Sequence, residues 1–352
     1  MKEKMKMHRF LLYLLSMTCL VGMFMLQGCL EDYLPKKLQQ KERSESITPG
    51  ENKQAEQERE MLPEGVLPLR VYFMEGRGHY LIPVTVTIPW TEGVGRAALE
   101  KVIEGPTPAQ EMRYGLYSPV PPTTEILGLT IRDRLAKLDL SGSFLSYDPG
   151  EERQVLNCIV FTLLQFPTVE EVQLLVDGVA PEAFPGGTPG KGTFSRERGI
   201  NLEVAVEPEA LEDAQLVTLY FYTVLGDSHI FYVPVSRVVA GGEDIIKVTI
   251  EELLKGPRQD GFLFSELPPG TVLRGYSLDD GILSVDFSRE LLNYKGGLRG
   301  EKNISAQIVL SLTEIPGVEK VQLLVEGEKV TLHYGTSFQE PLSPPLLVNP
   351  II

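Results

Sequence analysis

Cysteine, histidine and tryptophan are scarce in this sequence, and the shortage limits its chemistry. The 352 residues include three cysteines, four histidines and one tryptophan. Since no H-x-x-H, H-E-x-x-H or Cys/His cluster occurs, zinc lacks ligands, and we expect neither a metal nor a cofactor. Cys19 lies in the apolar leader and Cys29 in a lipidation motif. Cys158 alone then remains as a thiol, which excludes an intrachain disulfide.

Positive charge is also scarce. The formal net charge is −15 at neutral pH, and such an acidic surface repels nucleic acid and anionic lipid headgroups. We therefore expect no nucleic-acid partner and no membrane binding through a basic patch. Hydrophobic residues make up 43% of the chain, which is enough for buried cores. At about 100–200 residues per domain, the length suggests two domains.

The first 28 residues have the three parts of a secretory signal peptide. Residues 2–9 are basic, residues 10–26 are uncharged and mostly apolar, and Leu26-Gln27-Gly28-Cys29 follows. This end resembles a lipoprotein signal, in which the thiol of Cys29 carries diacylglycerol as a thioether. The alternative is an uncleaved membrane anchor, but seventeen residues are at the short limit for a span.

Residues 29–66 are predicted to be a flexible tether. They are rich in Glu, Lys, Gln, Ser and Pro, and they have few large apolar side chains with which to form a core. A flexible chain of this length has a root-mean-square span of about 30–35 Å. The segment would hold a folded body away from a bilayer. The alternative, a cleaved propeptide, has no signal in the sequence.

The rest of the chain contains two copies of one pattern. The repeated blocks are VQLLVDG (172–178) with VQLLVEG (321–327), Pro121-Pro122 with Pro268-Pro269, Leu138–Ser141 with Val285–Ser288, and Gly105-Pro106 with Gly256-Pro257. Their offsets of 149, 147, 147 and 151 residues are too regular to be chance. We therefore predict domain one at 67–202, a linker at 203–214 and domain two at 215–352.

Each repeat has the same predicted order of elements, β-β-α-β-β-α-β. Runs of β-branched and aromatic residues around a glycine-containing turn predict a hairpin. Apolar residues three and four apart predict two helices that end at glycine or proline. Alternation at 135–140 and 282–287 predicts strands with one buried face. Because each helix has one apolar stripe, we expect an α+β fold of two tandem two-layer sandwiches, each with its helices on one sheet face. The other sheet face would be open or would meet a partner.

These motifs resemble the GerMN-domain family. The resemblance rests on a helix ending in Gly256-Pro257, the segment Leu267–Leu273, the turn Asp280-Gly281 and the strand Val285–Ser288. Repeat one departs from the pattern at Arg134, which replaces the turn glycine. A lipobox followed by two such domains is similar to sporulation and germination lipoproteins of endospore-forming bacteria. The resemblance implies a fold related to ring-building motifs, no enzymatic activity, and a place in the complex that links mother cell and forespore.

Few residues could carry chemistry, and most favour a structural role. His79 and His229 lie beside aromatic residues at comparable places in the two hairpins, which is typical of half-exposed strand residues. Cys158, which corresponds to Gln307 in repeat two, has no predicted base or cation nearby and should lie at the edge of the core. Residues 186–193 (GGTPGKGT) resemble a phosphate loop, but they lack the helix that such a loop requires.

Acidic residues recur without forming an acid–base pair. Asp139 and Asp286 occupy equal positions on the wet side of a strand, where they should face solvent or cap the next segment. Glu151 and Glu152 precede a helix and favour its dipole. The segment 341–352 is expected to pack on its own domain, with docking to a partner as the alternative. We therefore predict no catalytic residue.

The leading functional hypothesis is a non-catalytic lipoprotein on the outer face of the cytoplasmic membrane. It would be a structural module that joins envelope or sporulation-complex proteins, with a homo-oligomer as a further expectation. The alternatives are a lipoprotein that binds a small ligand or glycan, and a protein that assists cell-wall remodelling. A glycan cleft would be rich in aromatic residues, whereas Trp90 is the only tryptophan.

Overall fold

The computed structural model describes residues 62–204, 213–242, 244–258 and 261–351. The predicted signal peptide, Cys29 and most of the predicted tether lie outside these residues, as does part of the predicted linker. All described residues belong to one compact unit. Within the described ranges, every helix is too short or too polar to cross a bilayer.

The elements of repeat one follow the predicted order, with a short helix and two short strands added. In chain order they are β1 (Val66–Glu75), β2 (Leu81–Pro89), α4 (Val94–Glu104), α5 (Pro108–Tyr114), β3 (Leu116–Tyr117), β4 (Ile126–Arg132), β5 (Leu135–Leu140), α6 (Glu152–Leu164), β6 (Glu171–Val176) and β7 (Glu203–Val204). Helix α4 ends at Gly105, as predicted, and α5 begins at the capping residue Thr107.

Repeat two has the seven predicted elements. They are β8 (Gln215–Leu225), β9 (His229–Val239), α7 (Ile245–Lys255), β10 (Leu273–Asp279), β11 (Ile282–Phe287), α8 (Gly297–Leu312) and β12 (Lys320–Val325). Asp244 caps α7 by accepting a hydrogen bond from Ile246 N at 2.8 Å, and Gly256 follows the last turn. Ile250 and Leu253, on the predicted apolar stripe, are buried.

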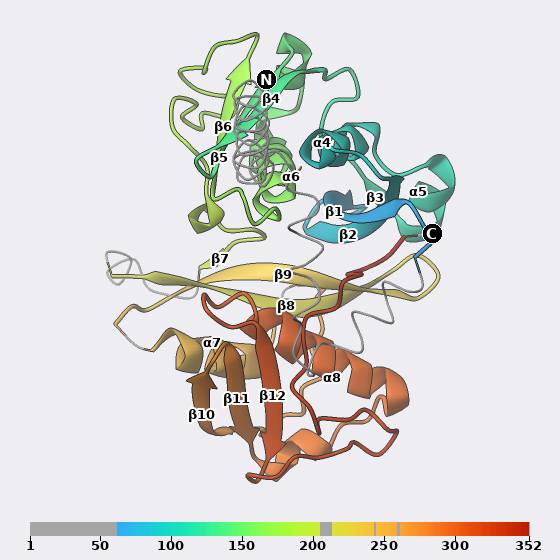
Figure 1. Cartoon of the computed structure of the whole chain (residues 1–352), viewed down its shortest axis with the longest axis vertical. Coiled ribbons are helices and arrows are strands. Elements are labelled where there is room, and N and C mark those ends of the chain that lie inside the picture. The colour runs from blue at the N-terminus through green and yellow to red at the C-terminus, as the bar shows by residue number, and fades with distance from the viewer. Residues whose placement is uncertain (1–61, 205–212, 243, 259–260, 352) are drawn as a thin grey trace, which may run out of the picture. The chain divides into compact units, whose positions relative to one another are not determined.

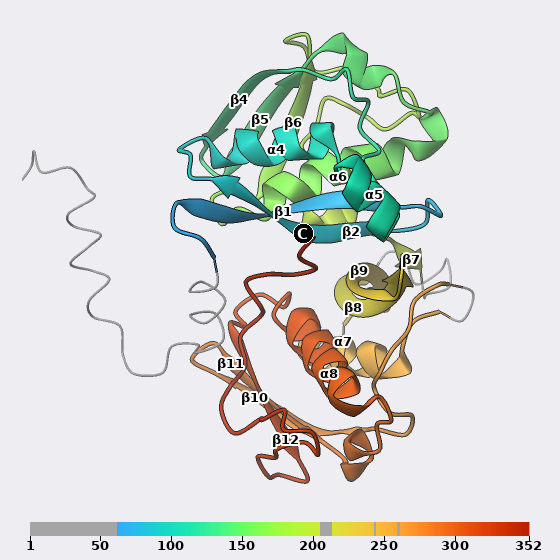
Figure 2. The same ribbon diagram turned by 90° about the vertical axis from the view of Figure 1, so that its right-hand side faces the viewer.

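The strands of each repeat form two hydrogen-bonded sheets instead of the single sheet expected. Their orders are β2-β1-β3 and β4-β5-β6 in repeat one, and β9-β8 and β10-β11-β12 in repeat two. Strand β7, from the end of repeat one, adds to the free edge of β9. Helices α4 and α6 lie between the two sheets of repeat one, and α7 and α8 lie between those of repeat two (Figure 1, Figure 2). The α+β class and the tandem arrangement are confirmed, and each sheet has the helices on one face.

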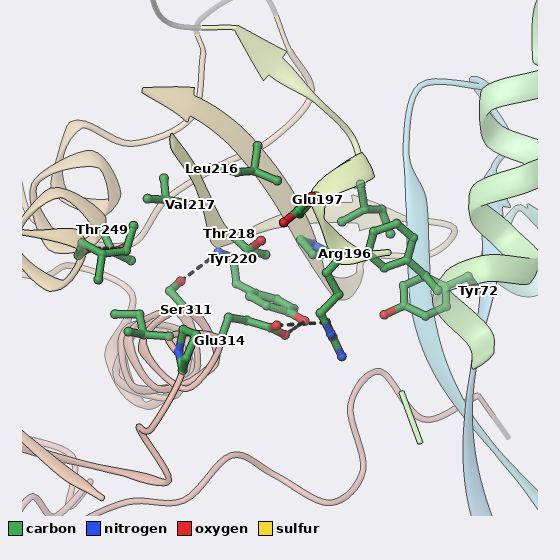
Figure 3. Close-up of a pocket in the computed structure, with 16 residues that line it drawn as sticks. Tyr72, Arg196, Glu197, Leu216, Val217, Thr218, Tyr220, Thr249, Ser311 and Glu314 are labelled. Carbon is green, nitrogen blue, oxygen red and sulfur yellow. Dashed lines mark hydrogen bonds and ion pairs between the residues drawn. The ribbon is translucent and has the colours of Figure 1, made fainter. Parts of the chain in front are cut away.

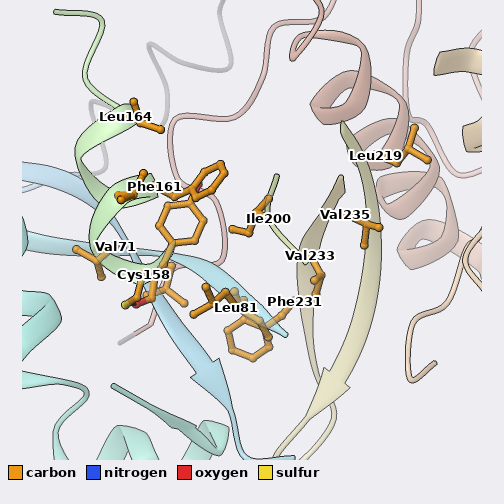
Figure 4. Packing of buried hydrophobic residues seen from close by; sticks show 14 of the residues in the cluster. Val71, Leu81, Cys158, Phe161, Leu164, Ile200, Leu219, Phe231, Val233 and Val235 are labelled. Carbon is orange, nitrogen blue, oxygen red and sulfur yellow. Dashed lines mark hydrogen bonds between the residues drawn. The ribbon is translucent and has the colours of Figure 1, made fainter. Parts of the chain in front are cut away.

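In each repeat the hairpin forms a sheet of its own, and the strands of this sheet are buried on both faces. The consecutive residues Val71–Met74 in β1 and Val233–Arg237 in β9 are buried, whereas a strand with one wet face alternates, as β5 and β11 do. One face of each hairpin packs on the helices of its own repeat. The other face packs on the hairpin of the other repeat (Figure 4). The sheet face that we expected to be open or to meet a partner is therefore filled, in the hairpins, by the second repeat.

The turns before β5 and β11 have the same backbone conformation despite their different sequences. Asp280 and Gly281 have φ values of 45° and 76°, and Asp133 and Arg134 have values of 50° and 64°. Positive φ at both central residues is the pattern of a type I′ hairpin turn, which Asp-Gly favours. The replacement of glycine by Arg134 therefore leaves this turn intact.

Candidate functional site

The junction of the two hairpins gathers buried side chains from both repeats. Strands β2 and β9 lie side by side in both views (Figure 1, Figure 2). Leu81 of β2 and Val233 of β9 are buried there, and Ile200 lies between the hairpins (Figure 4). These side chains belong to a single core cluster that runs through both repeats. The repeats therefore share a core instead of forming two separate ones.

Asn201, near the end of repeat one, joins the two hairpins. Its Oδ1 accepts a hydrogen bond from Leu81 N at 2.8 Å, and its Nδ2 donates to the carbonyls of Leu81 at 2.8 Å and Pro234 at 2.7 Å. Ile200 N donates to Ser236 Oγ at 3.0 Å, and Ser236 N donates to the Ile200 carbonyl at 2.8 Å. The end of repeat one thus pairs with a strand of repeat two.

Asn349, near the end of repeat two, has the same role in the opposite direction. Its Oδ1 accepts a hydrogen bond from Tyr232 N at 2.8 Å, and its Nδ2 donates to the carbonyls of Tyr232 at 2.8 Å and Pro83 at 2.7 Å. Thr85 donates to the Val348 carbonyl from its N–H at 2.9 Å and from its hydroxyl at 2.8 Å. The end of repeat two thus pairs with β2 of repeat one.

The two sets of contacts are related by the sequence repeat. Asn201 and Asn349 are 148 residues apart, and Pro83 and Pro234 are 151 apart. Each asparagine bonds twice to its own hairpin and once to the other. Both asparagines have positive φ, at 48° and 50°, a conformation that asparagine tolerates better than most side chains. The junction is therefore an internal two-fold interface in which each repeat places its tail on the other.

The exchanged tails correct one expectation. The segment 341–352 was expected to pack on its own domain, and Leu342 does pair with Val321 of repeat two. The following residues, Val348–Ile351, instead pair with β2 of repeat one. The similarity of the two tails indicates that each belongs to the repeat. It does not show which hairpin each tail joins, because most of the partner groups are main-chain atoms.

A buried arginine fastens the tail of repeat one to repeat two. Arg237 on β9 contacts Glu203 of β7 at 2.8 Å and Glu252 of α7 at 3.0 Å, and it donates to the Gly256 carbonyl at 3.0 Å. The Arg237 side chain is only 5% exposed. Sequence reasoning did not single out these residues, since the three charges are far apart in the chain and have no counterparts among the repeated blocks.

A small pocket with mostly apolar walls and a few polar groups opens beside the junction (Figure 3). Its volume is about 280 Å³, slightly below the size of most ligand pockets, which begin at about 300 Å³. Arg196 Nη1 lies 3.2 Å from Glu314 Oε2, and the Tyr220 hydroxyl donates to Glu314 Oε1 at 3.1 Å. Burial, and then the charge of Glu314, raise the pKa of Tyr220 well above its ordinary value. The phenol is therefore a neutral hydrogen-bond donor, and the pocket offers hydrogen bonds and charge.

Cys158 and its counterpart Gln307 both support the adjacent hairpin. The Cys158 thiol donates to the Tyr72 carbonyl at 2.8 Å, and Gln307 Nε2 donates to the Tyr220 carbonyl at 3.3 Å. Burial raises the pKa of the Cys158 thiol, which disfavours the nucleophilic thiolate. Cys158 is fully buried, so it lies inside the core and not at its edge as predicted.

The glycine-rich segment 186–193 folds around a carboxylate of the protein itself. The two carboxylate oxygens of Glu152 accept hydrogen bonds from Gly186 N and, at 2.8 Å, from Thr188 N. Burial acts to raise the pKa of Glu152, but hydrogen bonds from Thr188, Gly186 and Tyr147 lower it overall. These two backbone N–H groups, which could face a phosphate, are therefore already satisfied.

Repeat two has the same arrangement around Glu301. Its carboxylate accepts hydrogen bonds from Tyr334 N at 2.6 Å, from Thr336 N at 3.0 Å and from the Tyr294 hydroxyl. These bonds lower the pKa of Glu301 although burial opposes them, and burial and then this carboxylate raise the pKa of Tyr294 to about 12. This role of Glu152 and Glu301 was not predicted from the sequence. Their spacing of 149 residues was the available signal.

Asp139 and Asp286 cap the same turn in the two repeats. Each accepts a hydrogen bond at 2.8 Å from a glycine N–H after the last strand, Gly178 and Gly327 respectively. Asp286 also lies 3.3 Å from Arg274. Capping is one of the two roles expected for these residues, and no second carboxylate is needed to explain it.

The hairpin histidines contact the other repeat. His79 stacks on Phe262 with ring centroids 5.3 Å apart, and His229 meets Tyr114 edge-on at 4.9 Å. His79 is exposed and His229 is half-buried. Across the described ranges, no cluster of histidine, cysteine and acidic side chains could hold a metal ion. The two histidines therefore take part in packing at the junction.

The comparisons with known proteins agree with this architecture. The profile of the Germane family, described as sporulation and spore germination, matches residues 70–182 and 218–331. The spore germination protein GerM of Bacillus subtilis (strain 168) is 30% identical over 291 residues, which are 80% of this chain and 78% of that protein. The solved tandem GerMN domains of the sporulation protein GerM from Bacillus subtilis have a TM-score of 0.72 and 28% identity, covering 82% of this chain and 100% of that one. The resemblance drawn from the sequence is confirmed, and the chain belongs to the Germane family of sporulation and spore germination proteins, with two tandem GerMN domains.

Proposed function

We propose that this protein is a lipid-anchored, non-catalytic interaction module in spore formation and germination. The anchor would be diacylglycerol on Cys29, which places the repeats on the outer face of the cytoplasmic membrane. During sporulation this face borders the space between mother cell and forespore. The module would join other proteins of an envelope-spanning complex there. The similar proteins are named for sporulation and germination and not for an enzymatic reaction.

The junction is the observation that carries the proposal. It makes one body of the two repeats, and the polar residues that sequence reasoning considered for chemistry cap turns or hold loops. Glu152 is an example, and its counterpart Glu301 is held in the same way, since each carboxylate accepts several internal hydrogen bonds. One body on the tether that the sequence predicts would be suited to holding partners at a distance from a membrane.

The anchor is tested with a Cys29→Ser variant expressed in sporulating cells. Metabolic labelling with a fatty acid should mark the natural protein and not the variant, and the natural protein should sediment with membranes. Lys36→Ser, in the same segment, is the matched control and should leave labelling unchanged. Equal labelling of Cys29→Ser, or a natural protein that stays in the soluble fraction, would overturn the anchor.

Partner binding is tested at the sheet edges that the junction leaves open. Strands β4 and β10 each end a sheet and pair on one side only within the described residues. Leu127 on β4 and Leu278 on β10 are 50% and 42% exposed. A photocrosslinking residue at either position should capture envelope proteins in sporulating cells. The same residue at Val224, which is exposed on a hairpin, is the control. Equal capture at all three positions, or none at any, would contradict a specific interaction surface.

A second candidate function is the binding of a small ligand in the junction pocket. The observation that favours it is the combination of Arg196, Glu314 and Tyr220 with apolar walls in a cavity of about 280 Å³. A thermal-shift screen of small metabolites and glycans tests it, with Arg196→Gln as the binding-deficient variant. A ligand that raises the melting temperature of both proteins equally would not occupy this pocket.

A further inference from the structure

The internal interface offers groups that a second copy of the chain can also use. Repeat one contributes the main chain of Leu81 and Pro83, together with Thr85 and Asn201. Repeat two contributes the same groups at the equivalent positions, which are Tyr232, Pro234, Ser236 and Asn349. An interface with two-fold symmetry is formed by the same surface patch on both sides. Each half of this junction is therefore nearly self-complementary.

The contacts between the repeats do not depend on which chain supplies the second half. Asn201 and Asn349 each reach the other hairpin through a proline carbonyl, at 2.7 Å in both cases. The tails pair through main-chain atoms, with Ser236 N donating to the Ile200 carbonyl and Thr85 N donating to the Val348 carbonyl. Among the described residues, the pairing of Glu203–Val204 with β9 belongs to the tail of repeat one and is exchanged together with that tail.

We propose that the junction also forms between two copies of the chain. Repeat one of each copy then packs on repeat two of the other, with both tails exchanged, and the assembly is closed. It contains two junctions, each with the same contacts as the junction within a single chain. The surface involved is the outer face of the hairpins β1–β2 and β8–β9, and the partner is a second copy.

The balance between the single chain and the exchanged pair is set by concentration. Since the contacts are the same, the link between the repeats favours the single chain only by its effective concentration, which is about 1 mM for short linkers. From Val204 to Asp213 the chain can extend over about 30 Å, which permits the second repeat to leave its partner. Single chains should therefore dominate at micromolar concentration, and exchanged pairs should accumulate near millimolar concentration.

Cysteine pairs across the exchanged tail distinguish the two forms. Thr85 and Pro350 are partners in a parallel β-bridge between β2 and the tail of repeat two. In residues 30–352, Cys158 is the only natural cysteine, and it is buried. Two differently tagged chains of residues 30–352, one with Thr85→Cys and one with Pro350→Cys, are unfolded together. They are then refolded at about 10 μM or about 1 mM and oxidised. The lower value lies well below the effective concentration of about 1 mM, and the higher value equals it.

The expected result is a disulfide-linked species with both tags after refolding at the higher concentration, and little of it at the lower one. The double variant Thr85→Cys/Pro350→Cys, refolded at the lower concentration, should close its disulfide within one chain. Thr331 and Ser337 form a bridge inside repeat two and provide the matched control pair. Mixed single-cysteine chains of this control should stay unlinked, because exchange leaves both positions in one chain.

Two results would overturn the proposal. One is a double variant that closes its disulfide while mixed single variants never link at either concentration. The other is equal linking by the control pair, which would indicate random collision. Analytical ultracentrifugation of the unsubstituted chain after refolding near millimolar concentration provides a measurement without cysteine variants. It should show a species of twice the mass, and a single species of one-chain mass would count against exchange.

Discussion

Replacing Asn349 by alanine should loosen the junction and separate the unfolding of the two repeats. The substitution removes three hydrogen bonds and leaves the N–H of Tyr232 without its side-chain acceptor. An unsatisfied buried donor costs about 1–3 kcal/mol. The φ of 50° at this position costs an alanine about 1–2 kcal/mol more. The expected loss is therefore about 2–5 kcal/mol, a large share of the 5–15 kcal/mol of a typical domain.

Urea denaturation measures this loss and its location. Tryptophan fluorescence follows repeat one through Trp90, the single tryptophan, and far-ultraviolet circular dichroism follows both repeats. The natural protein should unfold in one transition by both probes, whereas Asn349→Ala should show transitions that no longer coincide. Asn349→Gly removes the same bonds but tolerates positive φ, so it should be less damaging by about 1–2 kcal/mol. An alanine variant within about 0.5 kcal/mol of the natural protein, with coincident transitions, would refute the reasoning.

Three further predictions concern Glu152, Arg237 and Cys158. Because hydrogen bonds lower the pKa of Glu152 in the folded state, its stabilisation is complete above the ordinary carboxyl pKa of about 4.3 and is lost as pH falls through the lowered value. The unfolding free energies of the natural protein and Glu152→Gln should therefore differ at neutral pH and converge in acid, and a constant difference would contradict this. Arg237→Leu should cost about 3–5 kcal/mol in urea denaturation, since Glu203 and Glu252 lose a buried partner. Converting both glutamates to glutamine in that variant should restore part of the loss. In residues 30–352, Cys158 should react with a thiol reagent only on unfolding, and fast labelling of the native protein would place it outside the core.

Much of the fold could be predicted because the duplication displays it twice. The offsets near 149 residues aligned the helices, the alternating strands and the hairpin turns, and a pattern seen twice is more reliable than either copy alone. The expectation of a single sheet in each repeat was wrong, because it placed all strands of a repeat in one layer beneath the helices. The unbroken burial of consecutive residues in Val71–Met74 and Val233–Arg237 is the sign of strands covered on both faces.

The junction itself was harder to predict for a physical reason. Asn201 and Asn349 were visible as a similarity between the two tails, but their partners are mostly backbone atoms, which the sequence does not label. The roles of Glu152 and Arg237 also depend on loops and strands brought together from distant parts of the chain. Local patterns, such as the Asp280-Gly281 turn, can be predicted because the residues that interact are neighbours in the sequence.

The use of main-chain atoms at the junction also bears on how the two copies diverged after duplication. A carbonyl or an N–H is present whatever side chain its residue carries, so Leu81 and Tyr232 perform one task with different side chains. In the hydrogen bonds between the tails and the hairpins, the side-chain groups are the amides of the two asparagines and the small hydroxyls of Thr85 and Ser236. The side chains of the hairpin strands can therefore differ between the repeats, while the contact that holds the two halves together has the same geometry on both sides.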